Sequence, residues 1–375
     1  MMSLLSVHRA DLAALANTDR LRSLAPRTGV DFASNDYIGL AASQRLHAAA
    51  SDALARGVPV GSGGSRLLRG NHPEHEALEA EAAAFFGAEA ALFLANGFVA
   101  NMALFATLPQ RGDLVVYDAL LHASAHDGMR LGRAERVAAA HNDVAAFKDA
   151  ITAWRAAGGS GRVWIAVESL YSMDGDQAPL AELAALADAA QAFLLIDEAH
   201  ATGVFGNSGR GLAETLEGQP NVITLHSCGK ALGAEGALLC LPAVLRDMLV
   251  NRARGFVFST APSPLIAAVV RDGLRALAQE PWRRDDLRAL IAAGGAALAP
   301  LGAIATGSPI LPLILGDDAR AMRVARAVQA AGFDVRGIRP PTVPDGTARL
   351  RISLTLNATP ADVDSLATAL QKALA

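Results

Sequence analysis

The stretch Phe193-Leu-Leu-Ile-Asp-Glu-Ala-His200 places four apolar residues directly before two acids and a histidine. A short apolar run of this kind is typical of a strand buried on both faces of a parallel sheet. Similar runs recur along the chain, and helical patterns such as residues 180–190 separate several of them. The strands that they predict are 91–94, 114–117, 163–167, 193–196, 222–225, 237–241 and 256–258. The alternation predicts an α/β fold with a mostly parallel seven-stranded sheet between helices.

The pattern of the sequence changes after about residue 275, where the regular alternation stops. There we expect a helix over 284–299, a strand over 310–315, a helix over 318–331 and a final helix from Pro360. These elements predict a smaller C-terminal α+β domain over 276–375, after a large domain over 46–275. Residues 1–45 are expected to form an N-terminal arm, whose apolar start is too short for a signal peptide and lacks its basic residues.

Composition narrows the possible classes of function. The chain has 375 residues, 52% of them hydrophobic and 19% charged, and its formal net charge is −4. No run of Lys and Arg marks a surface for nucleic acid, and no stretch of about twenty apolar residues could span a membrane. The two cysteines, Cys228 and Cys240, match neither a disulfide framework nor a zinc spacing, so we expect a cytoplasmic protein.

The segment Ser227-Cys-Gly-Lys-Ala-Leu-Gly233 surrounds a lysine with small residues. The chain has only three lysines, Lys148, Lys230 and Lys372, and the first and last lie in a surface-type helical pattern and near the C-terminus. A lysine that attacks a carbonyl must lose its proton, which requires desolvation or nearby positive charge. Small neighbours allow a planar ring to approach Lys230, and Ser227 could donate to a phosphate. Taken alone, however, a single lysine in a turn is more often an ordinary surface residue.

Polar residues follow the carboxyl ends of several predicted strands, where open α/β sheets bind their ligands. Glu168, Asp197, His200 and Ser227 all occupy such positions. An acid there can pair with a protonated ring nitrogen and keep the ring an electron sink, and His200 could reach a ring hydroxyl. A helix N-cap with a satisfied histidine, or a metal site, would explain Asp197 and His200 about as well.

Three further motifs each have a structural and a functional interpretation. Gly97 and Phe98 begin a helical pattern after a predicted strand, where backbone N–H groups can bind phosphate or simply form a turn. His122 follows another strand and can stack on an aromatic ring; no carboxylate stands at zinc-protease spacing, so we expect no metal. Arg349 and Arg351 share one face of a predicted strand, where they could clamp a carboxylate or line a solvated edge.

Glycine-rich motifs of other enzyme classes are missing from the sequence. The segment Gly61-Ser-Gly-Gly-Ser-Arg66 looks like a phosphate cradle but lacks the Lys-Ser/Thr ending of a nucleotide-binding P-loop. No glycine cluster follows a strand with Gly-x-Gly-x-x-Gly spacing, and no Gly-x-Ser-x-Gly occurs. These observations exclude nucleotide triphosphatases, NAD-dependent dehydrogenases and α/β-hydrolases. The candidate residues together could offer an amine, an acid that pairs with a ring nitrogen, an imidazole that stacks on a ring, a phosphate-binding loop and an arginine that binds a carboxylate.

Several long segments together resemble the α-oxoamine synthase family of fold-type I pyridoxal-phosphate enzymes, over nearly the whole chain. They are residues 34–40, 61–66, 168–176, 197–203, the loop around Lys230, and 341–351. The resemblance implies an acyltransferase of biotin synthesis that condenses L-alanine with a pimeloyl thioester, carried by coenzyme A or acyl carrier protein, with loss of CO₂. The alternatives are a sister synthase that uses glycine or serine with another acyl-CoA, and a fold-type I aminotransferase.

The resemblance also implies a role for each candidate residue. Lys230 would hold pyridoxal 5'-phosphate as a Schiff base, with Asp197 at the pyridine nitrogen, His200 at the ring oxygen and His122 stacked on the ring. Further cofactor contacts would come from Gly97, Phe98, Glu168, Ser172, Ser227 and, across a homodimer with shared active sites, Thr260. Substrate contacts would come from Asn35 and Arg351 at the amino-acid carboxylate, and from Arg22, His122 and Thr342. Ser227 replaces the family's usual threonine but keeps its hydroxyl.

Overall fold

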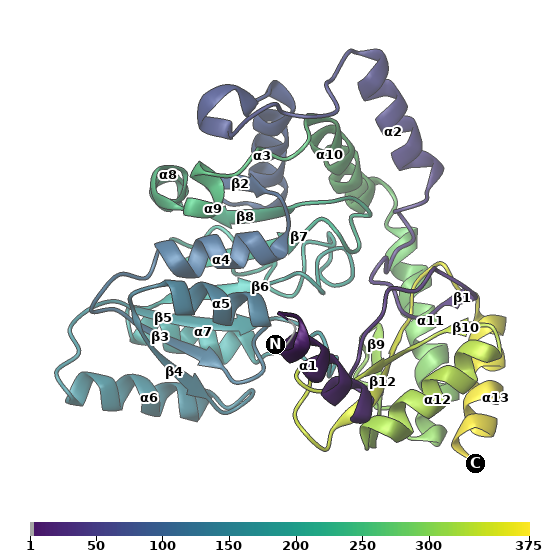
Figure 1. Cartoon of the computed structure of the whole chain (residues 1–375). Helices are drawn as coiled ribbons and strands as arrows, with labels where there is room; N and C mark the ends of the chain where they lie inside the picture. The colour runs from purple at the N-terminus through teal and green to yellow at the C-terminus, as the bar shows by residue number, and fades with distance from the viewer. Residues whose placement is uncertain (1–3) are drawn as a thin grey trace. The chain divides into compact units, whose positions relative to one another are not determined.

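The computed structural model describes residues 4–375, which divide into two compact units (Figure 1). The large unit comprises residues 38–172 and 176–284, and the small unit comprises the residues up to 37, residues 173–175 and residues 285–375. Residues 1–3 of the predicted N-terminal arm lie outside the described residues. Across residues 4–375, no helix combines the length and the apolar character needed to cross a membrane.

The large unit is built on a sheet that has seven strands within the described residues, in the order β2-β8-β7-β6-β5-β3-β4. They are β2 (Ala90–Leu94), β3 (Leu114–Asp118), β4 (Glu135–Ala139), β5 (Val163–Glu168), β6 (Phe193–Asp197), β7 (Val222–Ser227) and β8 (Ala237–Leu241). The neighbouring strands β7, β6, β5, β3 and β4 pair in parallel, whereas β8 is antiparallel to both of its neighbours, β2 and β7. The prediction of a mostly parallel seven-stranded sheet is therefore confirmed.

One predicted strand is wrong, and another strand takes its place in the sheet. Residues 256–258 do not form a strand, because they lie at the end of helix α9 (Arg254–Val257) and in its C-cap. So short an apolar run cannot distinguish a strand from a turn of buried helix. The missed strand is β4, at the edge of the sheet. Four of its five residues are exposed, so it has no apolar run to reveal it.

Helices cover both faces of this sheet. The helices of the large unit are α3 (Pro73–Phe86), α4 (Gly97–Thr107), α5 (Ala123–Leu131), α6 (Val144–Ala156), α7 (Leu180–Ala189), α8 (Ala243–Arg252), α9, α10 (Pro264–Gln279) and α2 (Gln44–Ala55), which packs against α10. In β5, Trp164 and Ala166 pack in one apolar cluster with α4 and α5. The alternate residues Ile165 and Val167 pack in a second cluster with α6 and α7. Because neighbouring side chains on a strand point to opposite faces, these two clusters lie on opposite sides of the sheet.

The small unit contains a three-stranded antiparallel sheet within the described residues, in the order β11-β12-β9. Its strands are β9 (Ile310–Gly316), β11 (Arg336–Ile338) and β12 (Ala348–Ser353). Its longer helices are α1 (Ser6–Asn17), α11 (Trp282–Leu298, from Asp285 onward), α12 (Asp318–Ala330) and α13 (Pro360–Leu374). The two-residue strands β1 (Val30–Asp31) and β10 (Phe333–Asp334) pair in parallel. The predicted C-terminal α+β architecture is confirmed.

Candidate active site

Three neighbouring strands of the large unit end in polar residues. β5 ends at Glu168, β6 at Asp197 and β7 at Ser227, and Glu168 pairs in register with Asp197. Because these strands are parallel, their carboxyl ends meet at one edge of the sheet. Lys230 follows β7 in a tight turn, in which its carbonyl accepts from the N–H of Gly233 at 2.9 Å. The charge on Lys230 affects the pKa of Glu168, so the two side chains lie near each other.

Asp197 is held in place by two hydrogen bonds. Its Oδ1 accepts from the backbone N–H of Ala199 at 2.9 Å, and its Oδ2 accepts from the side-chain amide of Asn101 at 2.8 Å. The same amide donates to Ser124 Oγ at 3.0 Å. The sequence analysis missed Asn101, although a buried amide within the apolar helix α4 is a signal of a polar partner. An aspartate fixed in this way could pair with a protonated ring nitrogen.

His122 is the N-cap residue of α5. Its Nδ1 accepts from the backbone N–H of Ser124 at 3.2 Å. The side chain is exposed in the isolated chain, yet the protein around it removes enough water to lower its pKa. The nearby Lys230 lowers this pKa as well, and the Asp197 carboxylate opposes both effects. An exposed, neutral imidazole beside Lys230 and Asp197 is suited to stack on an aromatic ring.

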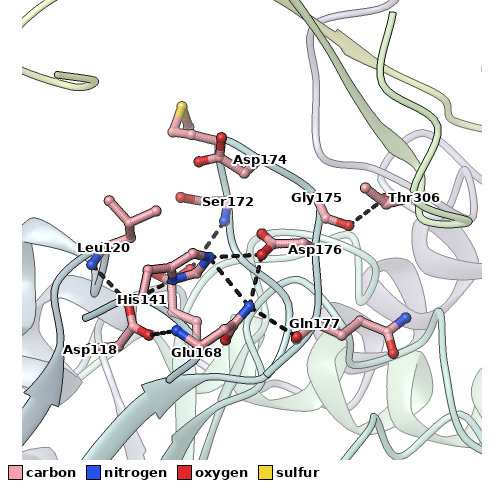
Figure 2. Close-up of polar contacts among 12 residues, drawn as sticks. Asp118, Leu120, His141, Glu168, Ser172, Asp174, Gly175, Asp176, Gln177 and Thr306 are labelled. Carbon is pink, nitrogen blue, oxygen red and sulfur yellow. Dashed lines mark hydrogen bonds and ion pairs between the residues drawn. The ribbon is translucent and has the colours of Figure 1, made fainter. Parts of the chain in front are cut away.

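Glu168 is only 3% exposed, and its two oxygens differ in their partners. Oε2 accepts from the backbone N–H of Ser172 at 3.2 Å (Figure 2), whereas Oε1 has no hydrogen-bond partner among residues 4–375. Burial and the neighbouring Asp197 carboxylate raise the pKa of Glu168 to about 8, against the effect of Lys230. A buried polar atom without a partner is uncommon in folded proteins. Oε1 is therefore a natural contact for a ligand bound at this edge.

The start of α4 faces the end of β7. The side chain of Asn96 caps the helix by accepting from the N–H of Val99 at 2.9 Å, and Gly97 is the first helical residue. A Cβ atom built on Gly97 would lie 4.0 Å from Ser227 Oγ, so the two residues are neighbours. The first N–H groups of a helix, here those of Gly97 and Phe98, have no acceptor within the helix and attract anions. Together with the Ser227 hydroxyl they would fit a phosphate group.

The last two predicted residues of the large unit differ in burial. His200 lies in the turn after β6 and is 6% exposed. Thr260 is exposed in the segment that precedes α10.

The residues of the large unit together offer a nucleophilic amine, an acid for a ring nitrogen, an imidazole for stacking and an anion cradle. This combination fits a planar, phosphorylated pyridine.

Arg351 and Asn35 lie together in the small unit. Arg351 Nη2 donates to Asn35 Oδ1 at 3.0 Å and to the hydroxyl of Tyr37 at 3.3 Å. Its strand β12 is the central strand of the sheet and Arg351 is buried, which excludes the solvated-edge interpretation. Arg349 on the same strand is paired with Asp174 at 2.6 Å. Of the two arginines, Arg351 is the one beside Asn35, as the carboxylate clamp requires.

Arg22 and Thr342 also meet within the small unit. Arg22 Nη2 donates to Thr342 Oγ1 at 3.1 Å, and both residues are exposed. Arg22 lines a pocket of about 580 Å³ whose walls include Leu12, Leu15 and Val343. A pocket with apolar walls and a guanidinium at its rim suits a chain that ends in a carboxylate. The predicted site residues therefore form two groups, one in each unit.

Comparisons with known proteins give consistent matches over most of the chain. The family model described as aminotransferase class I and II matches residues 27–370. The 8-amino-7-oxononanoate synthase of Anaeromyxobacter dehalogenans strain 2CP-1 is 45% identical over 97% of this chain and 94% of its own length. The synthase of the same name from Alkalilimnicola ehrlichii is 41% identical over 93% of this chain and 89% of its own.

Solved structures with the same architecture include two serine palmitoyltransferases and an 8-amino-7-oxononanoate synthase. Serine palmitoyltransferase of Sphingomonas wittichii superposes with a TM-score of 0.89 and 28% identity, over 99% of this chain and 98% of its own. The 8-amino-7-oxononanoate synthase of Francisella tularensis superposes with a TM-score of 0.77 and 26% identity, over 92% of this chain and 98% of its own. A serine palmitoyltransferase variant from S. paucimobilis, at a TM-score of 0.89 and 26% identity over 99% of this chain and 98% of its own, carries a bound PLP–myriocin aldimine.

Proposed function

The chain belongs to the aminotransferase class I and II family, and we propose that it condenses L-alanine with a pimeloyl thioester as an 8-amino-7-oxononanoate synthase. In this reaction a bond forms between the α-carbon of alanine and the thioester carbonyl carbon. The thiol carrier leaves from that carbonyl, and the alanine carboxylate leaves as CO₂. The observation that carries the proposal is the meeting of Lys230, Asp197 and the unpartnered Glu168 oxygen at one sheet edge. The chain's full-length likeness to synthases of that name supports the same assignment.

The large unit provides the groups that would hold pyridoxal phosphate. Lys230 would bind it covalently, while the start of α4 and the Ser227 hydroxyl would bind its phosphate. Asp197, oriented by Asn101, would keep a proton on the pyridine nitrogen. When bound, the cofactor supplies an electron sink for the charge that develops on the α-carbon. His122 would cover the ring, and His200 would contact the ring oxygen.

The chain's own residues would then handle the amino acid. We assign the carboxylate of alanine to Arg351 and Asn35, since a guanidinium fork matches carboxylate geometry. Lys230 Nζ would take the proton from the α-carbon, which requires that the amine is neutral. Arg22 and Thr342, at the rim of the apolar pocket, are the proposed contacts of the acyl substrate. Coenzyme A and acyl carrier protein are both compatible with an exposed rim.

We propose that two copies of the chain form a homodimer with shared active sites. Large apolar side chains are exposed near the site and in the segments around it, among them Leu68 at 84%, Phe258 at 73% and Phe98 at 45%. The segments that carry them contact one another, since α9 packs against both residues 66–70 and α4, and contiguous exposed apolar surface is typical of protein–protein contacts. Thr260 follows Phe258 closely and is itself exposed, which supports the proposal that it contacts the cofactor of the partner chain. A cytoplasmic location agrees with the two cysteines, Cys228 and Cys240, which are buried thiols.

Product identification tests the proposed function directly. Purified, cofactor-loaded protein is incubated with L-alanine and either pimeloyl-CoA or pimeloyl-acyl carrier protein, and the products are analysed by mass spectrometry. We expect 8-amino-7-oxononanoate from one or both donors, and the comparison of donors identifies the carrier. An aminotransferase would instead convert alanine to pyruvate without joining it to the acyl chain. Formation of pyruvate without the condensed product would overturn the proposal.

A further inference from the structure

His141 lies between two carboxylates in the large unit (Figure 2). It occupies the turn between β4 and α6, and its Nδ1 is 2.8 Å from Asp118 Oδ1 while its Nε2 is 2.7 Å from Asp176 Oδ2. The next residue, Asn142, has a left-handed backbone with φ of 56°. Among residues other than glycine, asparagine adopts this conformation comparatively often, and the contacts of its backbone and side chain hold the turn. None of these residues was among the predicted site residues.

Asp118 connects His141 to the segment that presents His122. It is fully buried at the end of β3, where its Oδ1 also accepts from the N–H of Leu120 at 2.8 Å. Its Oδ2 accepts from the N–H of Asn142 at 2.8 Å. The carboxylate thus fixes both the turn that contains His141 and the first residues after β3. Those residues lead directly to His122, the proposed stacking residue.

Asp176 connects His141 to the loop that follows β5. The backbone carbonyl of Asp176 accepts from the N–H of Tyr171 at 2.9 Å, and Leu170 pairs with Gln177 in an isolated antiparallel bridge. These contacts fold the loop back on itself. Ser172 lies in this loop, and its N–H donates to Glu168 Oε2 at the end of β5.

The side chain of Asn142 reinforces the connection to this loop. Its Nδ2 donates to Asp176 Oδ2 at 2.8 Å and to the carbonyl of Gln177 at 3.2 Å. The turn at His141 and Asn142 therefore binds both ends of the network, Asp118 on one side and Asp176 on the other. Two loops that carry cofactor-binding residues are joined through one short segment.

The geometry favours a charged imidazole. An ionised carboxylate only accepts hydrogen bonds, so between two ionised carboxylates both ring nitrogens of His141 donate, which makes the ring a cation. Although burial opposes the charge, the hydrogen bonds that the ring donates to Asp118 and Asp176 raise the pKa of His141 to about 10. The other titratable groups near this network are Tyr171, whose ring meets the imidazole edge-on at 4.4 Å between centroids, and Glu168.

We propose that His141 is a positioning residue. Its cation binds Asp118 and Asp176, and it thereby fixes the two loops that present His122, Ser172 and Glu168 to the cofactor. The inference rests on the proposed function for the identity of the cofactor, and on the contacts above for the network itself. Removing the cation would leave two carboxylates facing each other across an unfilled gap. The loops would then move apart, and the cofactor would lose contacts on two sides.

Cofactor affinity of the apoprotein tests this proposal without measuring turnover. We expect His141→Gln to bind pyridoxal phosphate at least tenfold more weakly than the unaltered protein, as measured by equilibrium titration of fluorescence. Adding Asp176→Asn to that variant removes one of the opposed carboxylates, so the double variant should recover part of the lost affinity. Phe147→Leu, a buried change on α6, is the control for general destabilisation and should keep its affinity within twofold.

The charge of His141 is measured on the unaltered apoprotein by NMR of ¹⁵N-labelled histidine. The signals of the His141 ring are identified by their absence from the His141→Asn or His141→Gln variant. We expect this ring to stay doubly protonated well above pH 8. Titration of that ring near pH 6.5, or cofactor affinity of His141→Gln within twofold of the unaltered protein, would overturn the proposal. Failure of the unaltered protein to bind pyridoxal phosphate would instead contradict the proposed function. If both His141 variants fail to fold, the single variant Asp176→Asn must weaken cofactor binding, or the proposal fails.

Discussion

Lys230 and Glu168 lie at the same edge of the sheet, and the charge of Lys230 acts on the pKa of Glu168. Burial and Asp197 favour the protonated form of Glu168, whereas the ammonium of Lys230 favours its carboxylate. At neutral pH the carboxyl group therefore keeps its proton in much of the population, and Oε1 can act as a donor or an acceptor. The residue beside the proposed nucleophile is thus adaptable in its hydrogen bonding.

Replacing Lys230 tests its proposed covalent role. Lys230→Ala should lower turnover by more than about 10³-fold, because the variant lacks both the covalent attachment and the proton acceptor. The absorbance band of the covalently bound cofactor should disappear as well. Lys148→Ala, on the exposed face of α6, should retain both turnover and absorbance. Substantial turnover by Lys230→Ala would refute the assignment.

Replacing Glu168 tests its buried charge. The pKa of Glu168 rises from an ordinary value of 4.5 to about 8 in the folded apoprotein. Between these values the folded state holds a proton that the unfolded chain has released, so stability should fall as pH rises from about 4.5 to 8. Glu168→Gln carries no such proton and should show a flatter dependence of Tm on pH. Thermal melts of both apoproteins between pH 5 and 8 make the comparison, and parallel curves would contradict it.

The sequence predicts single residues well when their signal is local. Lys230 is one of three lysines and is surrounded by small residues, and Asp197 directly follows an apolar run. Asn101 carries only the weaker signal of an amide within an apolar helix, and His141 carries none, because the importance of both comes from partners that are distant along the chain. Asn101 bonds to Asp197, and His141 joins Asp118 to Asp176. Such contacts exist only after the sheet has brought the loops together.

At the scale of elements, the start of α4 has a structural role as a capped helix end and a proposed role as a phosphate site. Its N-cap stabilises the helix, while its first residue, Gly97, lies beside Ser227. The predicted strands with apolar runs were found because they are buried on both faces. β4 was missed because an exposed edge strand needs no such run. Elements are therefore predictable in proportion to how much of their surface they bury.

Matched cap substitutions separate these two contributions of α4. Asn96→Ala and Thr359→Ala each remove an N-cap oxygen, at the start of α4 and α13 respectively, and each should cost about 1 kcal/mol of stability. Only Asn96→Ala should also weaken cofactor binding, by roughly 2–5-fold, because the fraying helix end is the proposed phosphate site. Equal cofactor affinity in both variants, measured by titration of the apoproteins, would argue against a phosphate at α4.

At the scale of the whole molecule, the account requires two chains for each complete site. Exposed apolar side chains such as Leu68 and Phe258 would be covered in the dimer, and Thr260 would reach the other chain's phosphate. The family resemblance predicts the homodimer and Thr260, but the exposed apolar side chains were not predicted, since the run at residues 256–258 was interpreted as a buried strand. The helix found there leaves Phe258 exposed instead.

Mixed dimers test the shared site. Lys230→Ala chains and Thr260→Ala chains are co-expressed, and the heterodimer is purified by two affinity tags. If each site takes Lys230 from one chain and Thr260 from the other, one site of the heterodimer is fully intact. At limiting cofactor the heterodimer should then be more active than either altered homodimer. Activity no greater than that of the Thr260→Ala homodimer would indicate that both residues act within one chain.

Release of CO₂ distinguishes the proposed condensation from every alternative reaction. The cofactor-loaded protein is given pimeloyl-CoA with L-alanine, glycine or L-serine in turn, and CO₂ is measured. The account predicts release with L-alanine and little or none with the other two amino acids. Release with glycine or serine in preference to alanine would make the chain a sister synthase. No release with any of the three, in a protein that binds the cofactor, would contradict the condensation itself.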